Sequence, residues 1–120
     1  ILVADDDRSV VDAIRYLLRA QDKNYRVKTS RDGYETLIAA GDFKPDLLIM
    51  DIRMPRIDGL EVCRRLRQNE NITRGMKILA ITGHSEAYDR DLVLRNGADE
   101  YLLKPFDKKS LLEHVERLIG

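Results

Sequence analysis

Two groups of aspartates stand directly after apolar runs in this sequence. Asp5, Asp6 and Asp7 end the first run, and Asp51 ends another about fifty residues later, at the start of DIRMPRIDG. If both runs are parallel strands, their carboxyl ends meet at one edge of a sheet, and the carboxylates converge there. Carboxylates held close together raise each other's pKa, so such a cluster commonly binds a cation, and Mg²⁺ suits ligands that are all oxygen. The pattern predicts a metal site.

Asp6 and Asp51 are the best candidates for direct metal ligands, because a buried Mg²⁺ takes about six oxygens and keeps several waters. Asp5 could act through a water or orient a ligand from behind. An aspartate beside such a cation can also be a nucleophile toward phosphorus, since the metal and nearby donors neutralise charge on the transferring group. Two further strand ends supply a hydroxyl at Thr82 and an ammonium at Lys104. Together these side chains predict phosphoryl transfer.

Each of these features has a simpler explanation when it is taken alone. An acidic cluster after a strand is more often a solvated turn than a metal site. Thr82 would more often cap a strand, and Lys104 would more often be a surface charge beside a turn. It is their joint placement at four strand ends that favours the functional site.

Five apolar runs of strand length alternate with helical patterns, which is typical of a parallel sheet covered by helices on both faces. The predicted strands are residues 1–4, 26–29, 47–50, 78–81 and 100–103. The second run alternates clearly between apolar and polar residues, so we place it at an edge of the sheet. The predicted fold class is therefore α/β, with a doubly wound, five-stranded parallel sheet.

The segments between the strands carry helical signals. Apolar residues recur at helical spacing over residues 10–18 and 111–119. The middle helices are marked by their ends: residues 33–40 after Asp32, 60–68 after Asp58, and about 87–96 with Gly97 as the C-terminal cap. Asp107 precedes the final helix at N-cap distance, and Gly120 closes it.

The composition excludes several function classes. The chain has 120 residues, 43% of them hydrophobic, which fits one compact domain. Lys plus Arg and Asp plus Glu number 21 each, so no overall field attracts nucleic acid or an anionic membrane surface. The longest apolar stretch, LLIM, is too short to span a bilayer, and the single Cys63 forms no internal disulfide, so we expect a cytoplasmic location. The sequence lacks a GxxxxGK loop, which disfavours a nucleotide pocket.

The order of these segments resembles the receiver domain of two-component response regulators, including those of the chemotaxis type. ILVADDD is similar to the family's first strand and acidic pair, and LIMDIRMPRIDG to its phosphoacceptor segment. ILAITG is similar to the strand with the switch hydroxyl, and YLLKPF to the segment with the lysine and proline. The resemblance covers essentially all of residues 1–120, and we expect any flanking domains to lie outside this chain. It implies a flavodoxin-like sheet of order 2-1-3-4-5 with five helices.

The resemblance implies a role for each acidic residue. Asp51 would accept a phosphoryl group from a histidine kinase or a histidine phosphotransfer protein. The Mg²⁺ cofactor would be held by Asp5, Asp6, Asp51 and the main-chain carbonyl of Arg53. Asp7 receives no direct metal role. Such a domain is not a conventional enzyme, although it catalyses its own phosphorylation and the slow hydrolysis of the product.

The resemblance also implies a switch between two arrangements of one fold. Thr82 and Lys104 would contact the phosphoryl group, and the peptide bond from Lys104 to Pro105 would be cis. Before phosphorylation Thr82 would point away from Asp51 and Tyr101 could sit outward. Afterwards Thr82 would move to the phosphoryl oxygen and Tyr101 would fill the vacated space. The alternative for Tyr101 is a half-buried strand aromatic with no switching role.

The switch would remodel the face formed by the fourth helix, fifth strand and fifth helix. That face would control an output domain or partner protein, and it could form a homodimer on activation. We expect no direct contact of this domain with nucleic acid or membrane.

Arg53, His84 and Gly83 are candidates for tuning the reaction rates, because they lie beside the expected site. Arg53 lies two residues after Asp51, and His84 lies two residues after Thr82. The alternative explanation is that both are solvated surface residues with no role in the reaction. Histidine would add pH sensitivity near its ordinary pKa of about 6.5. Gly83 places no side chain beside the pocket, which should leave it open to water and small donors.

Two other functions remain open from the sequence. An interaction module that is not phosphorylated would typically lack one of the five site residues, and all five are present. A phosphohydrolase would be expected to carry an acid two residues after the nucleophile, where Arg53 stands.

Overall fold

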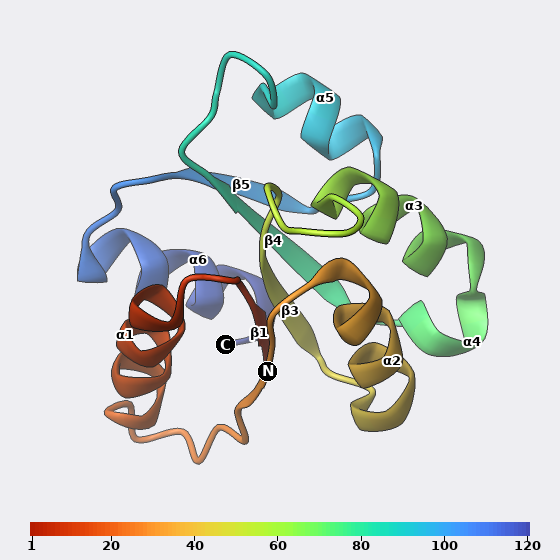
Figure 1. Cartoon of the computed structure of the whole chain (residues 1–120). Coiled ribbons are helices and arrows are strands. Elements are labelled where there is room, and N and C mark those ends of the chain that lie inside the picture. Colours follow the sequence, from red (N-terminus) through yellow and green to blue (C-terminus); the bar gives the residue numbers. More distant parts are fainter.

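Five parallel strands form one sheet in the computed structural model, which describes the backbone of residues 1–120 and every side chain except those of Glu70 and Ile72. The strands are β1 (Leu2–Ala4), β2 (Lys28–Ser30), β3 (Leu47–Asp51), β4 (Lys77–Thr82) and β5 (Glu100–Leu103). Their order is β2-β1-β3-β4-β5, and every neighbouring pair is parallel (Figure 1). The predicted doubly wound sheet and its strand order are confirmed.

The helices are α1 (Arg8–Arg19), α2 (Gly33–Phe43), α3 (Gly59–Gln68), α4 (Glu70–Thr73), α5 (Arg90–Arg95) and α6 (Lys108–Ile119). Five of them correspond to the five predicted helices, and α4 is an additional turn of four residues. A helix this short has no apolar period that a sequence could reveal. The fourth and fifth predicted helices are therefore α5 and α6. Among the described residues, the structure contains no helix that is both long and apolar enough to cross a membrane.

The predicted start of the fourth helix is wrong. It was expected over residues 87–96, but α5 begins at Arg90. The backbone of Asp89 is extended, and its side chain accepts a hydrogen bond from the Leu92 N–H, which makes Asp89 the N-cap. The preceding residues form a separate turn, closed by a hydrogen bond from the Tyr88 N–H to the His84 carbonyl.

The bounds of the second strand are also shifted. Residues 26–29 were predicted, whereas β2 occupies Lys28–Ser30, because its ladder with β1 pairs Leu2 with Lys28 and Ala4 with Ser30. The alternating pattern correctly placed this strand at the edge. It could not give the exact pairing, which depends on the neighbouring strand.

Helices cover both faces of the sheet (Figure 1). α1 and α6 pack on one face, and α2, α3 and α5 pack on the other. Alternate residues of β3 enter the two apolar layers, with Leu47 and Ile49 on the side of α1 and α6, and Leu48 and Met50 on the opposite side. Because both faces are covered, β3 is buried throughout and appears in the sequence as an unbroken apolar run.

An aspartate caps the N-terminus of five helices. In each case a side-chain oxygen accepts a hydrogen bond from a backbone N–H of the first turn. The caps are Asp7, Asp32, Asp58, Asp89 and Asp107. Because the strands are parallel, these helices all begin on the side of the sheet where the strands end. The positive ends of their dipoles therefore favour negative charge at that edge.

Candidate functional site

The carboxylates predicted to converge do lie together at the carboxyl edge of the sheet. One oxygen from each of Asp5, Asp6 and Asp51 lies within 4.8 Å of the others. Asp5 and Asp51 are buried, with 3% and 8% of their surfaces exposed, whereas Asp6 faces solvent. Opposite oxygens around a Mg²⁺ ion lie about 4.2 Å apart, so small adjustments would let all three bind one ion.

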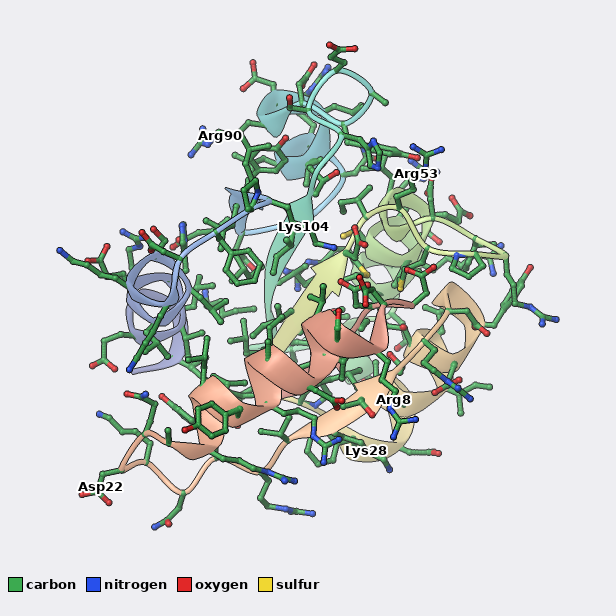
Figure 2. All side chains as sticks on the ribbon, turned by 60° about the vertical axis from the view of Figure 1, so that its left-hand side comes forward. Arg8, Asp22, Lys28, Arg53, Arg90 and Lys104 are labelled. Carbon is green, nitrogen blue, oxygen red and sulfur yellow. The ribbon has the colours of Figure 1, made fainter. Side chains whose placement is uncertain are left out.

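Lys104 joins the two buried carboxylates. Its Nζ donates to Asp5 Oδ2 and to Asp51 Oδ2, at 3.0 Å in both cases. The lysine follows β5, at the far edge of the sheet, and reaches back to the ends of β1 and β3. Figure 2 shows it beside the tip of the β3 strand, far from Asp22 in the connection between α1 and β2. The peptide bond between Lys104 and Pro105 is cis.

The environment shifts the pKa values of two members of this cluster. Burial raises the pKa of Asp5, and the charge of Asp51 adds to the effect, although the Asp7 N–H and Lys104 oppose it. For Lys104, burial acts to lower the pKa, but its hydrogen bonds and charge interactions with Asp5 and Asp51 outweigh burial and raise it. The ammonium is therefore held in its charged form by carboxylates that repel one another.

The loop between β3 and α3 fixes the surroundings of Asp51. The Arg53 N–H donates to Asp51 Oδ1 at 3.2 Å, and the Gly59 N–H closes the loop onto the Ile52 carbonyl at 2.6 Å. A Cβ at Gly59 would lie 2.8 Å from Ile52 Cα, so the helix start can approach the strand end this closely only with glycine. The metal role of the Arg53 carbonyl stays a prediction.

Asp7 has a structural task instead. Its Oδ1 accepts hydrogen bonds from the Ser9 N–H at 3.0 Å and the Ser9 hydroxyl at 2.7 Å, which caps α1. These bonds lower the pKa of Asp7. Asp7 lines the pocket but is not part of the cluster that could share one ion. Asp7 therefore stabilises the start of α1.

Thr82 ends β4, next to β3, and Tyr101 lies in β5 at the edge of the sheet. Thr82 is fully buried, and its hydroxyl accepts a hydrogen bond from the His84 N–H at 3.0 Å. Tyr101 does not sit outward: it packs against the apolar layer on the α5 side, and its hydroxyl donates to the Tyr88 carbonyl at 2.7 Å. Burial raises the pKa of this phenol, and the charge of Asp89 adds to the effect.

Arg53 and His84 meet at the rim of the pocket, from two different loops. Arg53 Nη1 lies 3.2 Å from His84 Nδ1 and 3.3 Å from Nε2. Arg53 is labelled in Figure 2 on the loop that follows β3. A Cβ at Gly83 would lie 3.6 Å from Lys104 Cβ, an ordinary contact, so this glycine is not required by the backbone.

Met54 and Pro55 also line the pocket, although no sequence argument singled them out. Their position directly after Asp51, Ile52 and Arg53 was the available signal. The complete lining is Asp5, Asp6, Asp7, Asp51, Arg53, Met54, Pro55, His84 and Lys104, around a volume of about 570 Å³. Such a pocket can hold a hydrated dication together with a phosphoryl-sized anion.

Comparison with known proteins identifies the class. The response regulator receiver domain family matches residues 1–116, and the chain belongs to this family. The chain is 39% identical over 119 residues to the alkaline phosphatase synthesis transcriptional regulatory protein PhoP of Bacillus subtilis. The match covers 99% of this chain and 48% of PhoP, so the chain spans about half the length of the curated relatives it matches.

Solved structures share the whole fold. The receiver domain of the sensor histidine kinase PA1611 from Pseudomonas aeruginosa PAO1, which has a magnesium ion in its active site cleft, superposes with a TM-score of 0.86 at 33% identity, covering 99% of this chain and 95% of that one. The signal receiver domain of a response regulator from Bermanella marisrubri gives 0.86 at 35% identity, covering 99% and 96%. The chain is therefore a receiver domain of two-component signal transduction.

Replacing Lys104 with Met should destabilise the domain by about 1–3 kcal/mol at pH 8, because two buried carboxylates lose their shared cation. The pKa of Asp5, already raised, should rise further. A carboxyl with a raised folded-state pKa costs stability as the pH rises from its unfolded-state pKa toward that raised pKa, so the penalty should be smaller at pH 5 than at pH 8.

Urea unfolding at both pH values measures this difference. Lys109→Met is the matched control, since that lysine side chain is 85% exposed and should change stability little at either pH. A penalty for Lys104→Met that is equal at pH 5 and pH 8 would contradict the electrostatic explanation.

Proposed function

We propose that Asp51 accepts a phosphoryl group, with Mg²⁺ bound by Asp5, Asp6, Asp51 and the carbonyl of Arg53. The observation that carries the proposal is the position of one ammonium between two buried carboxylates, beside a third carboxylate within reach of the same ion. The donor set is entirely oxygen and partly exposed to solvent, which suits Mg²⁺ and the waters that it retains. Bound Mg²⁺ would supply positive charge to the phosphoryl oxygens.

The donor would be a phosphohistidine of a histidine kinase or of a histidine phosphotransfer protein. A carboxylate oxygen of Asp51 would bond to phosphorus as the phosphorus–nitrogen bond breaks, and the histidine nitrogen would keep the electron pair of that bond. Lys104 already lies 3.0 Å from Asp51 Oδ2 and would donate to a phosphoryl oxygen. Slow attack of water on the same phosphorus would release inorganic phosphate and restore the Asp51 carboxylate.

A chain of hydrogen bonds offers a route from this chemistry to the surface. The Thr82 hydroxyl accepts from the His84 N–H, the His84 carbonyl accepts from the Tyr88 N–H, and the Tyr88 carbonyl accepts from the Tyr101 hydroxyl. If Thr82 turns toward a phosphoryl oxygen, the His84 N–H loses its acceptor and the loop between β4 and α5 must adjust. Tyr101 follows, since its partner lies in that loop.

The consequence would be a change in the face formed by α5, β5 and α6. We propose that this face controls an output domain or partner protein and that it forms a homodimer on activation. The proposed function gives this domain no direct role in binding nucleic acid or membrane. A domain assignment of residues 1–120, with flanking domains outside, stays a prediction, as does the cytoplasmic location.

Asp6 and Asp7 form a matched pair of neighbouring acids for testing the site. Asp6→Ala should abolish Mg²⁺-dependent phosphorylation by a small donor such as acetyl phosphate while leaving the fold intact, because Asp6 is an exposed ligand candidate. Asp7→Ala should cost about 1 kcal/mol of stability through the lost helix cap and should still be phosphorylated. Intact-protein mass spectrometry and urea unfolding measure the two effects. Normal phosphorylation of Asp6→Ala would contradict the assignment.

We also propose that Arg53 and His84 tune the rates at the rim. The Arg53 guanidinium and the His84 ring lie at the rim of the pocket that an anionic phosphoryl donor must enter. Arg53→Ala should therefore slow phosphorylation by acetyl phosphate about two- to tenfold, with an effect that weakens at high salt. His84→Ala should likewise change the rate of dephosphorylation, because the His84 ring lies at the same rim, in contact with Arg53.

Time courses of phosphorylation and of decay measure both rates. Gly83→Ala is the control that adds a side chain beside the pocket without changing any charge, since the added methyl makes only an ordinary contact with Lys104. Unchanged rates in both Arg53→Ala and His84→Ala would show that these side chains are plain surface.

A further inference from the structure

A buried pair of hydroxyls lies behind the metal carboxylates, at the junction between β2 and α2. Ser30 and Thr36 are both fully buried, and their hydroxyl oxygens lie 2.7 Å apart. The Thr36 hydroxyl donates its single hydrogen to the Asp32 carbonyl at 2.7 Å, so the Ser30 hydroxyl must donate to Thr36. This relay ties the end of β2 to the first turn of α2.

The junction contacts the backbone of one metal carboxylate directly. The Asp5 N–H donates to the Ser30 carbonyl at 3.1 Å, just beyond the point where the β1–β2 ladder pairs Ala4 with Ser30. The backbone of Asp5 is therefore held by Ser30, the residue whose hydroxyl donates to Thr36.

The same junction contacts the segment that follows the phosphoacceptor. At Gly33, the first residue of α2, a Cβ would lie 2.3 Å from Ile57 Cγ1 and 2.6 Å from the Ile57 carbonyl oxygen. The start of α2 is thus packed against the loop that runs from Asp51 to α3, and the two helices lie side by side (Figure 1). One junction supports both halves of the site.

We propose that Ser30 and Thr36 are positioning residues for the Mg²⁺ site, holding Asp5 at the distance from Asp51 that one ion requires. The inference rests on the proposed function, because it concerns the same metal. Mg²⁺ demands near-ideal octahedral geometry, so shifts of a few tenths of an ångström in one ligand reduce affinity. Residues that orient ligands from behind a metal site commonly change its affinity about 10- to 100-fold.

A purely structural role for this pair is the competing explanation, and the chain offers a control for it. Thr73 is also buried, and its hydroxyl likewise donates to the carbonyl four residues earlier, that of Asn69. It lies in α4, which precedes the start of β4, so it is far from the carboxyl edge. Thr36→Val and Thr73→Val therefore both remove a bond from a hydroxyl to a carbonyl four residues earlier, and Thr36→Val also removes the acceptor of the Ser30 hydroxyl, beside the site.

The experiment is a Mg²⁺ titration of the wild-type chain and the variants, followed by the amide NMR signals of Asp6 and Arg53, with melting temperatures measured in parallel. Both valine variants should melt at lower temperature. Only Thr36→Val should weaken Mg²⁺ binding, by about tenfold, and Thr36→Ser, which keeps the hydroxyl, should restore it.

Equal Mg²⁺ affinity in the wild type, Thr36→Val and Thr73→Val would overturn the positioning role while leaving the proposed function intact. A wild-type chain that shows no saturable Mg²⁺ binding would overturn both. If Thr36→Val does not fold, Ser30→Ala replaces it. That variant leaves the bond from Thr36 to Asp32 in place and should show a smaller loss of affinity in the same direction; unchanged affinity would again overturn the proposal.

Discussion

The structure depends on holding negative charges close together at one edge of a sheet. Asp5, Asp6 and Asp51 bring three carboxylates within reach of a single ion, two of them buried, and Lys104 supplies one positive charge between the buried pair. The carboxylates outnumber this cation, which leaves an excess of negative charge at a partly buried edge of the sheet. Burial raises the pKa of Asp5, with the charge of Asp51 adding to the effect, and against the effect of burial the two carboxylates raise the pKa of Lys104. A divalent cation would neutralise the excess negative charge.

The rest of the fold can be understood as support for this arrangement. The parallel sheet brings the ends of β1, β3 and β5 to one side, although they belong to segments about fifty residues apart in sequence. The helices begin at this edge, where their dipoles oppose the excess negative charge. Tight connections complete the site: Gly59 lets α3 start against Ile52, and Gly33 lets α2 start against Ile57. These supporting contacts are made by residues outside the site, so the site residues alone do not reveal them.

The sequence was sufficient for the features that depend on local pattern. Buried strands appear as apolar runs, and the polar residues that end them had to converge once the strands were parallel, so Asp5, Asp51 and Lys104 could be brought together without coordinates. Features that depend on contact between distant segments could not be predicted. Thr36 looks like any helix residue until Ser30 is placed beside it, and the inward position of Tyr101 depends on the path of the loop that carries Tyr88. The late start of α5 has the same origin, because Asp89 is one of several polar residues that could have capped it.

Beryllofluoride, which mimics an aspartyl-phosphate, tests the central claim most directly when it is added with Mg²⁺ and followed by amide NMR. The account predicts saturable shifts at Asp51 and Thr82 that extend through Tyr101 to the face of α5, β5 and α6, and their disappearance in Asp51→Asn. An absence of shifts in the wild-type chain, or the same shifts in Asp51→Asn, would contradict the claim that this charged edge is a phosphoacceptor site.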